Sequence, residues 1–305
     1  MASKNQSKLM KNIFKGTGVA LITPFKDTGE IDFESLSRLV KYCIEEGVDF
    51  LVTLGTTAES ATLSEREKEA VVRFIIKENN AVLPVLMGIG GNNTKLVCST
   101  LKSIPKGVDG VLCVTPYYNK PTQNGVYEHF KEISRVSEFP IVLYNVPGRT
   151  ATNMSSTTIL NLANNFENIV AIKEASGDLE QVMEVIRGSP DGFDVLSGDD
   201  NLTFSMIALG AKGVISVSGQ SFPKLLRDMV DSALAGRFSH ARSIHYKLFE
   251  YTQLLFAEGN PGGVKAALAY IGISKSNLRL PLWKISDATT DLINAKIDEI
   301  RDSKD

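Results

Sequence analysis

Eight short apolar runs alternate with amphipathic segments between Thr17 and Ala235, and this alternation is what most constrains the fold. The runs are apolar on both faces, which is typical of parallel strands buried on both sides. The segments between them carry their apolar residues on one helical face. We expect strands at residues 17–25, 48–55, 83–91, 108–116, 139–147, 169–172, 192–198 and 211–219. Such repeats predict an α/β fold, a closed (β/α)8 barrel; a doubly wound open sheet is the alternative, but it would leave two strand edges unpaired.

Beyond Ala235 the apolar pattern is helical only, and no linker rich in Pro, Gly or Ser interrupts it. We read the stretches around Leu248, Val264 and Ile297 as helices packed on the barrel rather than as a second catalytic domain. The expected organisation is therefore a tail (1–15), a barrel (16–235) and a C-terminal helical region (236–305).

The charge balance argues against several classes of partner. With 33 basic and 35 acidic residues the net charge is −2, so we expect neither a nucleic-acid nor a membrane partner. No apolar run approaches membrane-spanning length, and the basic N-terminus lacks the apolar core of a signal peptide. Cys43, Cys98 and Cys113 form no CxxC pair and are interpreted as reduced thiols, which favours a cytoplasmic protein.

Lys173 is the strongest candidate for covalent chemistry, because it ends the β-branched run 169–172 just before polar residues. On a two-residue period it shares a face with Ala171 and Ile169, which leaves a small side chain beneath it. Burial disfavours a charged amine, and a neutral amine attacks carbonyl carbon. The alternative is a lysine that extends into water. Tyr144 ends the preceding strand about 5 Å away, where its phenol could exchange protons with the lysine or simply belong to the core.

Other polar residues follow the strands at the carboxyl end of the barrel, where active sites lie in this architecture. The GTTAES loop (55–60) offers hydroxyls and backbone N–H groups suited to a small carboxylate. The GIGGNN loop (88–93) lacks the spacing of a phosphate-binding loop. His129, His240 and His245 lack ligand spacing, so we expect no metal and no organic cofactor. The remaining strand-end motifs are TPYYNKP (115–121), YNVPGRT (144–150) and SGDD (197–200).

Together with GVISV (213–217), these motifs occur in the order and spacing of the dihydrodipicolinate synthase family, which the chain resembles from about Gly16 into the last helix. That family belongs to the pyruvate-dependent class I aldolases, which include N-acetylneuraminate lyase. The resemblance implies a (β/α)8 barrel with a helical C-terminal region, assembled as a homodimer or homotetramer. It also implies condensation of pyruvate with L-aspartate 4-semialdehyde through a lysine Schiff base, giving 4-hydroxy-tetrahydrodipicolinate for diaminopimelate and lysine biosynthesis.

The resemblance assigns four catalytic positions. Lys173 matches the Schiff-base lysine, and Tyr144 matches the residue that donates and accepts protons. Thr56 and Tyr118 match the other members of the family's proton relay.

The resemblance also assigns substrate-binding positions. Thr57 and Ile215 match residues that contact pyruvate, Gly198 belongs to the same set, and Arg149 matches the arginine that engages the semialdehyde carboxylate at the entrance. Ala58 stands where the family usually has glycine. If that position requires a positive φ, alanine costs about 1 kcal/mol.

Two other functions stay open. The first is a lyase acting on a sialic acid or a 2-keto-3-deoxy sugar acid. Arg149 argues against it, because a guanidinium suits a second carboxylate rather than sugar hydroxyls. The second is a non-catalytic barrel that binds a keto acid, which would have no reason to keep Lys173, Tyr144 and Thr56 together.

Adjacent aromatic residues point to a shared site between subunits. Tyr117 and Tyr118 cannot both enter one barrel mouth, and the resemblance implies that Tyr118 completes a neighbour's relay; alternatively, both cap their own barrel.

Lysine-sensitive members of the family bind the inhibitor at the dimer interface. They carry a glutamate where this chain has Leu96 and histidines where it has Glu65 and Lys68, so we expect weak inhibition by L-lysine.

Overall fold

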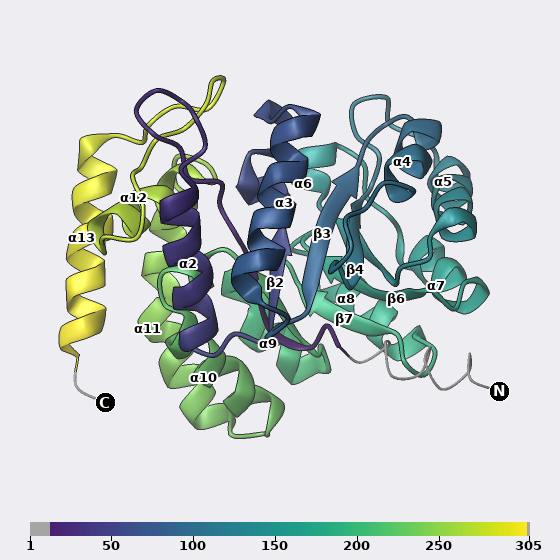
Figure 1. The fold of residues 1–305 in the computed structure, drawn as a ribbon. Coiled ribbons are helices and arrows are strands. Elements are labelled where there is room, and N and C mark those ends of the chain that lie inside the picture. Colours follow the sequence, from purple (N-terminus) through teal and green to yellow (C-terminus); the bar gives the residue numbers. More distant parts are fainter. Residues whose placement is uncertain (1–12, 304–305) are drawn as a thin grey trace.

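The computed structural model describes residues 13–303, and within them eight parallel strands close into a barrel (Figure 1). Each strand pairs with the next in the chain and β8 pairs with β1, so the sheet has no free edge. The (β/α)8 prediction is confirmed, and the open-sheet alternative is wrong. The strands are β1 (Gly16–Ala20), β2 (Phe50–Thr53), β3 (Val85–Gly90), β4 (Gly110–Val114), β5 (Ile141–Asn145), β6 (Ile169–Glu174), β7 (Asp194–Ser197) and β8 (Gly213–Ser216). Residues 1–12 of the expected tail lie outside the described part of the chain.

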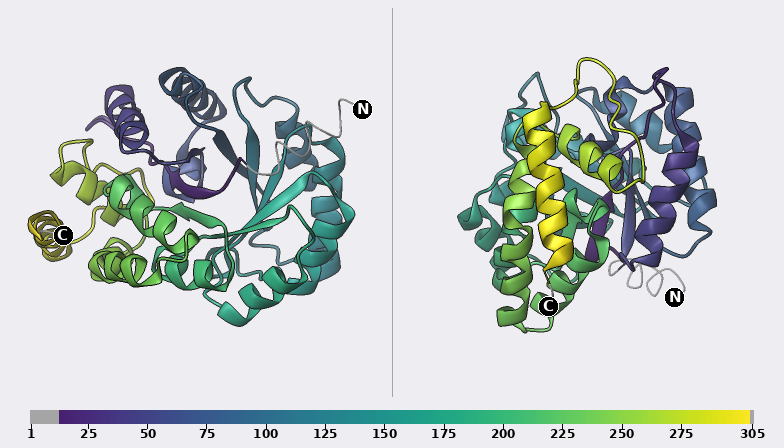
Figure 2. Two further views of the ribbon diagram at one scale, coloured as in Figure 1. Left: turned by 90° about the horizontal axis from the view of Figure 1, so that it is seen from below. Right: turned by 90° about the vertical axis from the view of Figure 1, so that its left-hand side faces the viewer.

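The helices that follow the strands cover the outside of the barrel (Figure 2, left). The spacing of Ser64 and Glu67 predicts a capping box at the start of α3, and this is confirmed. The Ser64 side chain accepts from the Glu67 N–H at 3.3 Å, and the Glu67 carboxylate accepts from the Ser64 N–H at 2.9 Å. The barrel helices are α2 (Phe33–Glu45), α3 (Glu65–Asn79), α4 (Thr94–Leu101), α5 (Gln123–Val136), α6 (Pro147–Thr150), α7 (Ser156–Asn165), α8 (Leu179–Gly188), α9 (Thr203–Leu209) and α10 (Pro223–Leu234).

Some of the predicted strands are too long. The first ends at Ala20, although Leu21, Ile22 and Phe25 after it are at most 1% exposed. These residues form a buried connection rather than part of the sheet. An apolar run reports burial, and burial does not require strand pairing.

Apolar side chains form two layers, one inside the barrel and one between barrel and helices. The two-residue period predicts that Ile169 shares the inner face with Ala171, and this is wrong. A register irregularity in the β5–β6 ladder places Ile169 in the outer layer, whereas Val170 and Ala171 both belong to the inner one. Ala171 still lies on the barrel interior beneath Lys173.

Three helices beyond the barrel, α11 (Phe238–Phe256), α12 (Gly262–Tyr270) and α13 (Asp287–Asp302), stack on one side of it (Figure 2, right). Helix α11 packs on α10, and α13 packs on α11 and α12. The apolar pattern predicts that Leu292, Ile293 and Ile297 share the packed face of α13. This is wrong for Leu292, which is 56% exposed, whereas Ile293 and Ile297 are fully buried. Among the described residues no helix has the length and hydropathy needed to cross a membrane.

Candidate active site

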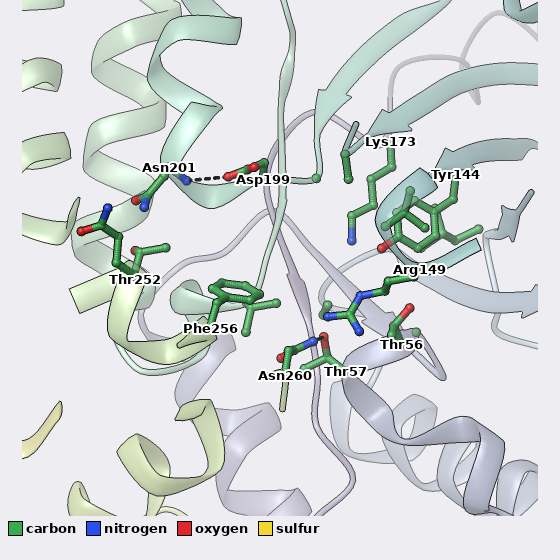
Figure 3. Close-up of a pocket in the computed structure, with 18 of the residues that line it drawn as sticks. Thr56, Thr57, Tyr144, Arg149, Lys173, Asp199, Asn201, Thr252, Phe256 and Asn260 are labelled. Atoms are coloured by element: carbon green, nitrogen blue, oxygen red, sulfur yellow. Dashed lines mark hydrogen bonds between the residues drawn. The ribbon is translucent and has the colours of Figure 1, made fainter. Parts of the chain in front are cut away.

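A cavity of about 470 Å³ opens at the carboxyl end of the barrel strands (Figure 3). Its wall is built by residues that follow β2, β5, β6 and β7, together with residues from the C-terminal helical region. Six of the predicted site residues line it: Thr56, Thr57, Tyr144, Arg149, Lys173 and Gly198.

Lys173 and Tyr144 lie side by side at the base of this cavity. They are register partners in the β5–β6 ladder, and each is 6% exposed. The Lys173 Nζ lies 4.4 Å from the centroid of the Tyr144 ring. Inside the barrel, Val170 and Ala171 of β6 belong to the apolar inner layer. The amine is therefore held beside a phenol and faces the cavity (Figure 3).

Gly198 forms the surface against which the lysine stem rests. A Cβ at this position would lie 2.8 Å from Lys173 Cε, 3.0 Å from Lys173 Cγ and 2.8 Å from the Cβ of Ala175. The Gly198 N–H donates to the Glu174 carbonyl at 2.7 Å, which ties the end of β7 to the strand that carries the lysine. Glycine is required here because the lysine stem occupies the space of a side chain.

The loop after β2 brings Thr56 and Thr57 to the opposite wall. Thr57 is 3% exposed, and its Oγ1 accepts from the Asn260 side-chain amide at 2.9 Å. The hydroxyl proton of Thr57 is therefore free to be donated to a ligand. Ala58 belongs to a 3₁₀ turn (Thr56–Ala58) and is not left-handed; Glu59 is, at φ 54°. The condition under which alanine at position 58 would be costly is therefore not met, because the residue with positive φ is the next one.

Arg149 marks the entrance to the cavity. It is exposed and lies in the short helix α6, whose first residue is Pro147. Figure 3 shows its guanidinium between Lys173 and the loop that carries Thr56 and Thr57. The exposed Arg149 and the buried Lys173 therefore line the same cavity.

Two predicted residues do not line the cavity. Ile215 is 1% exposed and packs in the inner barrel layer. Tyr118 is 87% exposed, with φ 73°, and neither it nor Tyr117 reaches the cavity of its own barrel.

Several lining residues were missed by sequence reasoning. Asp199 lines the pocket, and burial, reinforced by neighbouring Asp200, raises its pKa. Thr252, Phe256 and Asn260 come from the C-terminal helical region, which the sequence suggested was only packing. The one local signal for them is the turn sequence that begins at Asn260, where Asn-Pro is followed by two glycines.

No group of three or more His, Cys, Asp or Glu side chains within residues 13–303 lies together so as to hold a metal ion. His129, one of the histidines considered as a ligand, is instead buried between α4 and α5, with its Nδ1 2.9 Å from Thr94 Oγ1. Burial lowers the pKa of His129 to about 4, so this side chain is neutral at pH 7.

A closed barrel whose strand ends hold a buried lysine beside a tyrosine has the architecture of lyases that bind keto acids covalently through an imine. The chain belongs to the dihydrodipicolinate synthetase family, whose model matches residues 13–300.

The relatives match over nearly the whole chain. It is 48% identical to 4-hydroxy-tetrahydrodipicolinate synthase of Phocaeicola vulgatus over 294 residues, covering 96% of this chain and 99% of the relative. The crystal structure of dihydrodipicolinate synthase from Thermotoga maritima has a TM-score of 0.93 and 40% identity, covering 95% of this chain and 99% of that one. A structure described as the first monomeric dihydrodipicolinate synthase variant has a TM-score of 0.92 and 40% identity, covering 95% and 98%.

Proposed function

We propose that this protein is a 4-hydroxy-tetrahydrodipicolinate synthase, a lyase that condenses pyruvate with L-aspartate 4-semialdehyde. The observation that carries the proposal is the buried Lys173 beside Tyr144, in a cavity whose entrance holds Arg149. The family membership of nearly the whole chain supports the same reaction. Its product feeds diaminopimelate and lysine biosynthesis, and we place the protein with the cytoplasmic enzymes of that route.

The first half of the reaction joins pyruvate to the enzyme. The Lys173 amine attacks the ketone carbon, and Tyr144 delivers a proton to the resulting oxygen. Loss of water then leaves an iminium, which draws electrons from the neighbouring methyl group. Removal of a methyl proton gives the enamine. Thr57 suits the pyruvate carboxylate, because Asn260 occupies its acceptor side and leaves its hydroxyl proton available.

The second half forms the carbon–carbon bond. The enamine carbon attacks the aldehyde carbon, and the aldehyde oxygen takes up a proton to become a hydroxyl. The amino group of the former semialdehyde then adds to the iminium carbon and displaces Lys173, which closes the ring. Arg149 holds the semialdehyde carboxylate as a charge-assisted pair, so the aldehyde is presented to the enamine in a fixed orientation.

We propose that the active unit is at least a homodimer. Tyr118 is 87% exposed and Leu96, in α4, is 65% exposed. The Asn92 amide donates to the Tyr117 carbonyl at 3.3 Å, which links the loop before α4 to the loop that carries Tyr118. An exposed tyrosine that turns away from its own pocket can serve the proton relay only by reaching a second subunit. The similar structure described as a monomeric variant makes the oligomeric state of this chain worth measuring directly.

We further propose that L-lysine inhibits the protein weakly. Leu96 offers no acceptor for the inhibitor's ammonium. Glu65 could have replaced that acceptor, but its carboxylate is paired with Lys68 Nζ at 2.7 Å. Lys68 also places a positive charge beside this position, which disfavours a cationic ligand.

Borohydride trapping tests the proposal. Borohydride added with pyruvate should reduce the imine and attach the three-carbon unit to Lys173, as located by peptide mass analysis. Lys173→Ala should abolish trapping, and omission of pyruvate is the matched control. Turnover with L-aspartate 4-semialdehyde but not with a sugar aldehyde then identifies the second substrate. Trapping that survives Lys173→Ala contradicts the assignment.

A further inference from the structure

Glu59, the residue after the Thr56–Ala58 turn, directs a carboxylate away from the cavity and into the protein. Its side chain is 0% exposed. Its backbone is left-handed, at φ 54° and ψ 34°, which is unfavourable for a residue other than glycine. The Glu59 carboxylate accepts from the Arg279 backbone N–H at 3.0 Å and forms an ion pair with Lys265.

Lys265 meets this carboxylate from α12, a helix more than 200 positions further along the chain. Its side chain is also 0% exposed. Its Nζ donates to the Asn277 carbonyl at 2.8 Å and lies 4.2 Å from the centroid of the Phe25 ring. The buried ammonium is therefore surrounded by a carboxylate, a backbone carbonyl and an aromatic ring.

The same part of the chain also holds the neighbouring threonine. Asn260, two residues before α12 begins, donates to Thr57 at 2.9 Å, and Lys265 pairs with Glu59. The loop that carries Thr56 and Thr57 is thus held at two points by one short segment of the chain, residues 260–265.

Stability alone does not account for such a pair. Two apolar side chains of similar volume stabilise a buried contact as well as, or better than, an ion pair, because desolvation opposes the Coulomb attraction. What an ion pair adds is direction: Glu59 can satisfy Lys265 and the Arg279 N–H together in one arrangement only. A strained backbone beside a binding loop also indicates that the surrounding contacts enforce the conformation.

We propose that the buried Glu59–Lys265 ion pair positions the 55–60 loop for the carboxylate of the keto-acid substrate, so that Glu59 and Lys265 are positioning residues for pyruvate binding. The inference rests on the proposed function. Neither side chain lines the cavity, and both act through Thr57 and its neighbours.

The experiment compares Glu59→Gln, Lys265→Met and the double variant with the wild type. Two readouts are needed: the pyruvate concentration that half-saturates borohydride trapping, and the midpoint of thermal unfolding. Each single variant should raise the half-saturating concentration roughly tenfold or more, because small displacements of a binding group are costly. Of the two single variants, Glu59→Gln should lower the unfolding midpoint less. Burial already lowers the pKa of Lys265 to about 8, so a lysine left alone can release its proton and the variant can still fold.

The double variant separates positioning from stability. With no charge left unpaired, it should regain much of the lost unfolding midpoint, while its half-saturating pyruvate concentration stays raised. Ile297→Ala, which opens a cavity at a fully buried site on α13, is the matched control and should lower the midpoint without changing pyruvate saturation.

The outcomes are distinct. Recovery of pyruvate saturation in the double variant, or an equal loss in Ile297→Ala, overturns the positioning role. Wild-type saturation in both single variants also overturns it while leaving the proposed function intact. Failure of the wild type itself to trap pyruvate refutes the proposed function instead.

Discussion

Replacing Gly198 by alanine tests how closely the reaction depends on the position of the Lys173 amine. The new Cβ would lie 2.8 Å from Lys173 Cε and 2.8 Å from the Cβ of Ala175. Carbon atoms at rest are about 3.5–4.0 Å apart. The lysine stem must therefore withdraw by about 1 Å, and the contact with Ala175 can be relieved only by a local shift of the backbone.

The magnitude follows from this displacement. A reacting group moved by about 1 Å can lose on the order of 100-fold in rate, and overpacking costs about 1–3 kcal/mol of stability. We therefore expect Gly198→Ala to fold, to lower kcat/KM about 100-fold, and to slow borohydride trapping in parallel. The backbone of Gly198 is not left-handed, so alanine adds no φ strain that would confuse the result.

The assay combines steady-state kinetics with the rate of borohydride trapping at fixed pyruvate. Gly148→Ala is the matched control, because this glycine lies in α6 beside Arg149 and a Cβ there would meet nothing within 4 Å. It should behave like the wild type. A Gly198→Ala variant that is trapped at the wild-type rate would refute the argument that glycine is needed to seat the lysine.

Four further expectations concern other parts of the molecule. Arg149→Ala should raise the KM for the semialdehyde, by about 2–4 kcal/mol in binding free energy, and leave pyruvate trapping unchanged; an unaltered KM would count against the carboxylate clamp. Mixing inactive Tyr118→Phe with inactive Lys173→Ala subunits should restore activity in mixed dimers, and no recovery despite proven subunit exchange would contradict the shared site. L-Lysine titrated into the assay should half-inhibit only at millimolar concentration or above, because Leu96 cannot accept from its ammonium; half-inhibition below the millimolar range would show that Glu65 supplies the acceptor. Burial lowers the pKa of His129 in the folded protein to about 4. Between pH 6.5 and 4 the imidazole is therefore protonated more readily in the unfolded chain than in the folded one. The wild type should lose about 3 kcal/mol of stability over that interval relative to His129→Gln, measured by urea unfolding at each pH; equal losses would refute the buried neutral imidazole.

The sequence alone determined the barrel and the two side chains at its chemical centre. Alternation of apolar runs with amphipathic segments is a local property, because it depends only on which face of each element is buried. A strand-end position is local too, so Lys173 and Tyr144 could be placed on neighbouring strands, and they are register partners. Cap signals within one turn, such as the box at Ser64, could be identified for the same reason.

Local patterns misled where the strand geometry is irregular. A two-residue period assigns Ile169 to the inner face, but an irregularity in the ladder with β5 turns it outward. Such a shift depends on the neighbouring strand, which a single segment does not encode. The left-handed residue in the threonine loop is likewise Glu59 rather than Ala58, because contacts from outside the loop hold it there.

Only the tertiary structure decided which distant residues complete the site. Asn260 reaches Thr57 across 203 positions of sequence, and Lys265 meets Glu59 from the same part of the chain. The need for glycine at position 198 becomes evident only in the structure, where the Lys173 side chain passes over it. Polar contacts of this kind follow from packing of whole elements, and helical periodicity records that a face is buried without recording what lies against it.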